Sequence, residues 1–117
     1  MAFGWFRKKE NQSALDYSEI DSNEKAIDLF EKEKLAKLYL MPLEFGGQDH
    51  AMNILYVPEF AVLFKARFDG MIENLLQQRK KLSYSASPEY KGKSFIPSKL
   101  NITVKGDIQF SETIEIW

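Results

Sequence analysis

The segment Gly46–His50 brings together residues that could do acid–base or binding chemistry. It reads GGQDH, so the chain's single histidine directly follows the carboxylate of Asp49, and Glu44 lies shortly before the two glycines. An imidazole beside a carboxylate can act as a general base or as a single metal ligand. Adjacency in a loop does not supply the orienting partner that a catalytic base needs. We therefore expect a polar binding loop; a small enzyme or ligand-binding protein with a site at Glu44, Asp49 and His50 is the alternative.

The segment Lys91–Ser94 imitates the end of a phosphate-binding loop. Its KGKS sequence lacks the earlier glycine of that motif, because Ser87 stands at the position. Pro97 and the strand-like pattern after it exclude the helix that would aim N–H groups at a phosphate. We therefore expect an exposed basic loop. The residues expected to contact a partner come from these two loops and are Gln48, Asp49, His50, Tyr90, Lys91 and Lys93.

The first nine residues combine aromatic and cationic side chains, which are Phe3, Trp5, Phe6, Arg7, Lys8 and Lys9. The cations follow the aromatic residues, which reverses the order found in a secretory signal. Aromatic rings and cations both favour the headgroup region of an anionic membrane. Because the segment is short for an anchor, a peripheral membrane protein held weakly by residues 3–9 is one alternative. Docking of the aromatic residues onto the protein's own sheet or onto a partner protein is another.

The composition excludes several classes of site. The 117 residues include no cysteine and one histidine, which excludes disulfide frameworks, thiolate metal sites and multi-histidine zinc sites. We expect no cofactor and no metal. The net charge of −1 argues against nucleic acid as a partner. Residues 10–64 carry 4 basic and 11 acidic residues, whereas residues 65–93 carry 7 basic and 3 acidic, and such segregation could steer a charged protein.

The front half of the chain contains a short helix and two strands by pattern. The helix should begin near Asp21 or Ser22, where the spacing of polar residues suits a helix cap. The strands should span Leu38–Phe45 and Asn53–Val57 and neighbour each other. Pro42 marks the first of them as an edge strand or a bulged strand, since proline cannot donate to a ladder.

The clearest element is a long helix that begins at Pro58. Its apolar residues recur with i, i+3, i+4, i+7 spacing. The stripe comprises Phe60, Leu63, Phe64, Arg67, Phe68, Met71, Ile72, Leu75 and Leu76. We expect this stripe to cover the dry face of a sheet. Gly70 interrupts the helix, and close packing of another backbone would explain it.

After Lys81 the apolar period changes from helical to two residues. Three segments alternate in this way, from Leu82, from Leu100 and from Phe110, and a longer connection joins Pro88 to Pro97. We predict an α+β fold: an antiparallel or mixed sheet of about five strands packed on one long amphipathic helix, with a shorter N-terminal helix. Residues 1–20 should be a flexible leader or linker, and residues 21–117 should form a single α+β domain.

These patterns favour binding over catalysis, because no nucleophile–base pair and no metal cluster is apparent. We predict a small intracellular protein-binding module, inhibitor-, immunity- or adaptor-like, that acts by surface contact without catalysis. The lack of an export signal leads us to expect a cytoplasmic location. A last strand that ends at Trp117 could lie at a sheet edge, and an unpaired edge invites pairing with a second copy.

Overall fold

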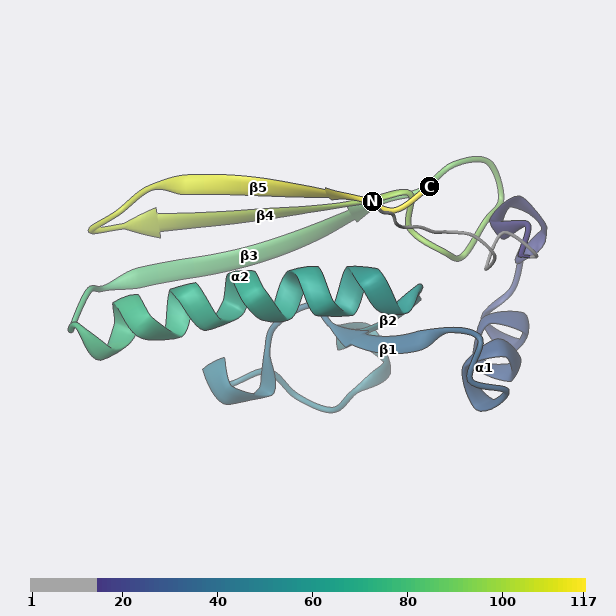
Figure 1. Ribbon diagram of the computed structural model, residues 1–117, viewed down its shortest axis with the longest axis horizontal. Helices are drawn as coiled ribbons and strands as arrows, with labels where there is room; N and C mark the ends of the chain where they lie inside the picture. Colours follow the sequence, from purple (N-terminus) through teal and green to yellow (C-terminus); the bar gives the residue numbers. More distant parts are fainter. Residues whose placement is uncertain (1–14) are drawn as a thin grey trace, which may run out of the picture.

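A computed structural model describes residues 15–117 and has an α+β fold, as predicted (Figure 1). The helices are α1 (Asn23–Glu31) and α2 (Glu59–Gln77), and the strands are β1 (Ala36–Tyr39), β2 (Ile54–Val57), β3 (Leu82–Glu89), β4 (Lys99–Gly106) and β5 (Phe110–Glu115). Short 3₁₀ helices span Tyr17–Glu19, Leu43–Phe45 and Ala51–Asn53. In this part of the chain, neither α-helix is long and apolar enough to cross a bilayer.

The strands form two separate antiparallel sheets, so the prediction of one sheet of about five strands is wrong. β1 and β2 make a hairpin in which Leu38 lies opposite Leu55, and β3, β4 and β5 make a three-stranded meander. Figure 1 shows α2 running along the meander, with the hairpin beside the N-terminal half of the helix. Pro58 follows β2 directly and is the N-cap of α2, so the chain passes from the hairpin into the helix without a loop.

β1 is shorter than the predicted strand Leu38–Phe45. It ends at Tyr39, and the chain then passes through Pro42 into a 3₁₀ helix. Proline lacks the N–H that a ladder needs. The Asn53 side chain satisfies the backbone of Met41 instead, accepting from its N–H at 2.8 Å and donating to its carbonyl oxygen at 2.9 Å. The connection predicted to begin at Pro88 begins after Glu89, because β3 is an edge strand and an edge tolerates proline.

The main core lies where the hairpin, α2 and the meander meet. β4 alternates as predicted, with Leu100, Ile102 and Val104 turned inward and fully buried. Around Leu100 and Ile102 pack residues from the other elements, which are Leu38, Val57, Ala61, Ile114 and Ile116. A second cluster of Ile20, Ala26, Leu35 and Ile96 closes the end of the molecule near α1.

Residues before α1 pack against the β3–β4 connection. The Phe95 N–H donates to the Ile20 carbonyl oxygen at 2.7 Å, and the Ser94 hydroxyl donates to the Tyr17 carbonyl oxygen at 2.6 Å. These contacts join Tyr17 and Ile20 to the domain that we predicted to begin at residue 21. The tail residues 3–9 lie outside the described residues.

Candidate functional site

The structure offers two candidate sites, a groove between α2 and β5 and a cleft between α2 and the hairpin. Helix α2 contributes to both, because three of its faces differ in their surroundings. The face toward the core carries Ala61, Lys65 and Ile72, all buried. A second face turns toward β5 and is apolar but exposed. A third face turns toward the hairpin and carries polar groups. Gly70 lies on this third face, and an added Cβ there would meet no atom within 4 Å, so the expected close packing of another backbone is wrong.

The exposed apolar face consists of Phe60, Leu63, Phe64 and Met71. Their exposed fractions are 42%, 58%, 55% and 47%, respectively. We expected these four residues to cover a sheet, and for them that prediction is wrong. The helix is apolar around more of its circumference than one sheet can cover. The core takes the narrower side centred on Ala61 and Ile72 and leaves the larger side chains in solvent.

This apolar face continues into a groove against β5. The groove has a volume of about 340 Å³ and is lined by Phe64, Arg67, Phe68, Met71, Glu112 and Ile114. Phe68, which lines the groove, packs against Phe110 of β5, and the two ring centroids lie 5.4 Å apart. The Arg67 guanidinium lies 5.6 Å from the centroid of the Phe64 ring. Within residues 15–117, neither Arg67 nor Glu112 forms an ion pair.

The outer edge of β5 borders the same groove. Among the described strands, β5 pairs only with β4. The Ile116 N–H donates to the Ser98 carbonyl oxygen on the β4 side at 2.7 Å. Because backbone groups alternate in direction along an antiparallel strand, the odd-numbered residues Ser111, Thr113 and Glu115 direct theirs to the open edge. An apolar helix face and an unpaired strand edge therefore lie side by side.

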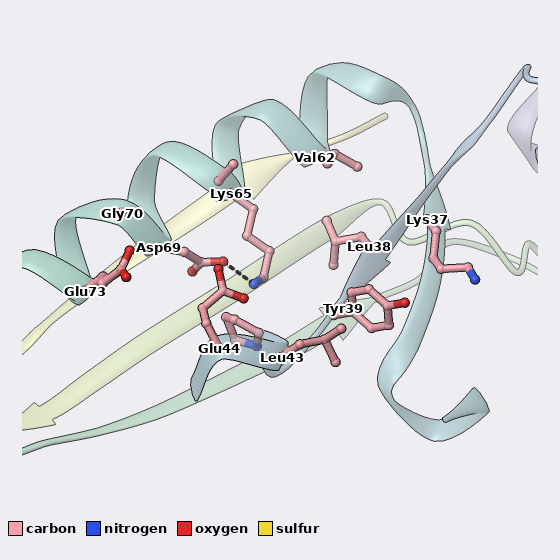
Figure 2. Close-up of a pocket in the computed structure, with 12 residues that line it drawn as sticks. Lys37, Leu38, Tyr39, Leu43, Glu44, Val62, Lys65, Asp69, Gly70 and Glu73 are labelled. Atoms are coloured by element: carbon pink, nitrogen blue, oxygen red, sulfur yellow. Dashed lines mark hydrogen bonds and ion pairs between the residues drawn. The ribbon is translucent and has the colours of Figure 1, made fainter. Parts of the chain in front are cut away.

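On the other side of α2, a buried polar network forms the floor of a cleft (Figure 2). The Lys65 ammonium lies 2.7 Å from one oxygen of Asp69, and the Tyr84 hydroxyl donates to the other oxygen at 2.7 Å. Burial lowers the pKa of Lys65, and the nearby Asp69 carboxylate opposes that shift. Burial raises the pKa of Tyr84 far above its ordinary value, and its hydrogen bond to Asp69 adds to the rise.

The cleft above this network measures about 230 Å³ and has charged walls. Glu44 from the 3₁₀ helix after β1, Glu73 from α2 and Lys37 from β1 line it. Figure 2 shows the Glu44 side chain pointing toward the Lys65–Asp69 pair. Such a cleft could hold a small polar ligand. Lys65, Asp69 and Tyr84 are not among the residues predicted from the sequence. A Lys–Asp pair four residues apart is also the ordinary signature of an exposed helix face, and Tyr84 joins the pair only through the fold.

The predicted loop site is not assembled around Glu44, Asp49 and His50. The Asp49 carboxylate accepts a hydrogen bond from the Tyr39 hydroxyl at 3.1 Å. The His50 Nδ1 accepts from the Met52 N–H at 3.2 Å and so caps a 3₁₀ helix. Glu44 faces the Lys65 cleft, whereas His50 and Gln48 line a separate shallow hollow. The Asp49 and His50 side chains therefore support local structure, and all three of Gln48, Asp49 and His50 are exposed.

The second predicted loop lies between β3 and β4. Tyr90, Lys91 and Lys93 are exposed there, and the Lys91 ammonium lies 5.1 Å from the ring centroid of Trp117. No hydrogen bond, ion pair or ring contact within residues 15–117 joins this loop to Gln48–His50. The six expected contact residues thus belong to two separate loops.

Comparison with family models, with curated proteins and with solved structures finds no match to this chain. In the described part of the chain, no group of three or more His, Asp or Glu side chains is arranged to hold a metal ion.

Proposed function

We propose that this chain is a small protein-binding module that acts by surface contact and not by catalysis. The observation that carries the proposal is the exposed apolar face of α2, with Phe60, Leu63, Phe64 and Met71 each at least 42% exposed. Together these side chains expose on the order of 400 Å² of apolar surface, a size that on monomeric proteins often marks an interaction site. Burial of this surface against a partner chain would remove it from water.

The surroundings of this face define the chemistry of the partner. The centre of the partner surface must be apolar, since aromatic and methionine side chains dominate the face. It must offer a carboxylate to Arg67 and a cation to Glu112, because both charged groups line the groove. It must also satisfy the open backbone groups of β5, which a strand does best.

The test is affinity purification of the tagged full-length chain from its native cell, compared between two variants. Phe64→Glu places a charge at the centre of the apolar face. Ala66→Glu places the same charge on an exposed position of the same helix, away from that face. We expect wild type and Ala66→Glu to retain the same partner chain and Phe64→Glu to lose it. Equal retention by all three proteins would contradict the proposed surface.

A second candidate function is binding of a small polar ligand in the cleft that contains Glu44. The buried ammonium of Lys65 at the cleft floor favours it. A thermal-shift screen of polar metabolites would test it, with Glu44→Gln as the variant expected to lose any stabilisation. His50→Ala serves as the control, because His50 lines a different hollow.

We also propose a role in binding for the two predicted loops and a cytoplasmic location for the protein. Contact through the exposed loop residues Gln48–His50 and Tyr90–Lys93 would extend the partner surface beyond α2, and alanine variants in the same purification would test it. A cytoplasmic location fits such a module, and fractionation of cells that express the tagged chain would test that location.

A further inference from the structure

We propose that the partner of the α2 apolar face is a second copy of this chain, paired antiparallel through β5 about a two-fold axis at Thr113. The inference rests on the proposed function and names its partner. Two meanders would join into one sheet of order β3-β4-β5-β5-β4-β3. The two α2 helices would then lie side by side on the same face of that sheet and bury their apolar faces against each other.

The surface formed by α2 and β5 is complementary to itself. A two-fold contact places the same patch on both sides, so every group must find its complement within that patch. Arg67 and Glu112 line the same groove with opposite charges. Across a two-fold axis, Arg67 of each copy can meet Glu112 of the other. The apolar side chains of α2 in one copy pack against the same side chains in the other, and the open edge of β5 pairs with the identical edge of the second copy.

The charges on β5 select the register. With Thr113 on the axis, Thr113 faces itself and Ser111 faces Glu115. These are the odd-numbered residues whose backbone groups point to the open edge, and the pairing would form about six hydrogen bonds. A register with Glu112 on the axis would set two carboxylates directly opposite each other, which is destabilising. A shift by a single residue would set the dry face of one strand against the wet face of the other.

The size of the surface is consistent with a stable dimer. A standard interface buries roughly 800 Å² on each partner. The four apolar side chains of α2 supply about half of that area by their exposed fractions. The edge of β5, together with Arg67 and Glu112, adds polar surface to it. Within residues 15–117, no other element covers this edge or this face.

Charge reversal tests the reciprocal ion pairs. Analytical ultracentrifugation of wild type at micromolar concentration should give a mass twice the 13.6 kDa of one chain. Arg67→Glu and Glu112→Arg should each weaken the dimer roughly a hundredfold, because each places like charges across the axis. An equal mixture of the two variants should restore the dimer, since every pair in the mixed dimer is then of opposite charge. Ala66→Glu should leave the dimer unchanged, and a mixture that stays monomeric would overturn the inference.

A cysteine at the axis tests the register by a route that does not alter charge. The chain has no cysteine. Facing residues at a hydrogen-bonded antiparallel position have Cα atoms about 5.5 Å apart, within the range that a disulfide spans. Thr113→Cys should therefore form a disulfide-linked dimer on mild oxidation. Ser111→Cys should not, because two copies of Ser111 lie four residues apart along the paired strands. Equal linkage of both variants would overturn the register.

The outcomes separate this inference from the proposed function. Suppose that wild type stays monomeric at high concentration but retains another protein in the affinity purification, and that Phe64→Glu loses this protein. The second copy is then excluded as the partner, and the proposed binding surface is supported. If wild type is monomeric and Phe64→Glu loses nothing, both proposals fail. Far-UV circular dichroism of each variant establishes that it is folded before its mass is interpreted.

Discussion

The Lys65 ammonium lies 2.7 Å from the Asp69 carboxylate, and the two side chains are only 4% and 13% exposed. The pair lies on the inner side of α2, one turn apart, and the Tyr84 hydroxyl reaches it from β3. The Lys65 ammonium also lies 5.3 Å from the centroid of the Tyr84 ring. Helix and sheet are therefore joined by a mostly buried charged group at the floor of the cleft, where water reaches it little.

We expect Asp69→Asn to lower the free energy of unfolding by about 3 kcal/mol, because it removes the hydrogen-bonded counter-charge of buried Lys65 and leaves only Glu44 nearby. The double variant Lys65→Met/Asp69→Asn should recover most of this loss, since no charge then remains to be buried. Urea denaturation of the three proteins measures both effects.

The matched control is Asp28→Asn. Asp28 and Lys32 form an ion pair with the same spacing and residue types at 2.9 Å, but both side chains are more than half exposed. Water screens such a pair, so its loss should change the urea midpoint far less than the loss of Asp69. Equal shifts for the two variants would show that burial does not set the strength of the Lys65–Asp69 pair.

Tyr84 should make the protein less stable in alkali. Its pKa is raised by burial and then by Asp69, whereas an unfolded tyrosine ionises near pH 10. Above that pH the unfolded chain releases a proton that the folded chain retains. The free energy of unfolding then falls by about 1.4 kcal/mol for each pH unit.

Tyr84→Phe has no such proton, and it isolates this effect. At pH 8 it should be less stable than wild type by about 1 kcal/mol, for the lost hydrogen bond. Between pH 10 and pH 11 that gap should close or reverse. Urea unfolding at several pH values measures the gap, and a constant difference across this range would mean that Tyr84 titrates alike in both states.

The sequence predicted the elements better than their arrangement. Proline at the start of α2 and strict alternation in β4 are local signals, and both elements appear where they were expected. The division into two sheets depends on which strands meet, and no local pattern records that. The buried polar network could not be predicted for the same reason, since Lys65 and Asp69 form it only together with Tyr84, which lies on a strand distant in sequence.

The face of α2 that turns to the core could not be predicted from the apolar stripe of the helix. A helix with apolar residues on one face normally turns that face to the core. Here Ala61 allows close approach of neighbouring elements, and the long stem of Lys65 packs inward like an apolar side chain. The larger residues Phe60, Leu63 and Phe64 are left outside. Their exposure became visible only in the folded structure, and it is the basis of the proposed function.

The tail residues Phe3–Lys9 predict a weak attachment to anionic membranes. We expect full-length protein to bind vesicles that contain phosphatidylserine at low ionic strength, and a variant with Arg7, Lys8 and Lys9 changed to Gln to bind roughly a hundredfold less, at about 1 kcal/mol for each cation removed. Physiological salt should weaken the wild-type interaction, because it screens the cations. Vesicle co-sedimentation measures both. Equal binding by the two proteins would remove the membrane alternative.

Two glycines should respond to alanine in opposite directions. Gly70 lies inside α2 with open space around its missing side chain. Gly70→Ala should therefore stabilise the fold by about 0.5 to 1 kcal/mol, since alanine loses less backbone entropy in a helix. Gly47 lies against the chain that leaves β1, and a Cβ there would overlap the carbonyl oxygen of Met41.

Gly47→Ala should consequently destabilise the fold by more than about 2 kcal/mol, because backbone and not a flexible side chain would have to move. The Asn53 side chain, which bonds to both polar groups of Met41, would shift with it. Thermal unfolding should show the midpoint rising for Gly70→Ala and falling for Gly47→Ala. A fall for both would contradict the open space beside Gly70.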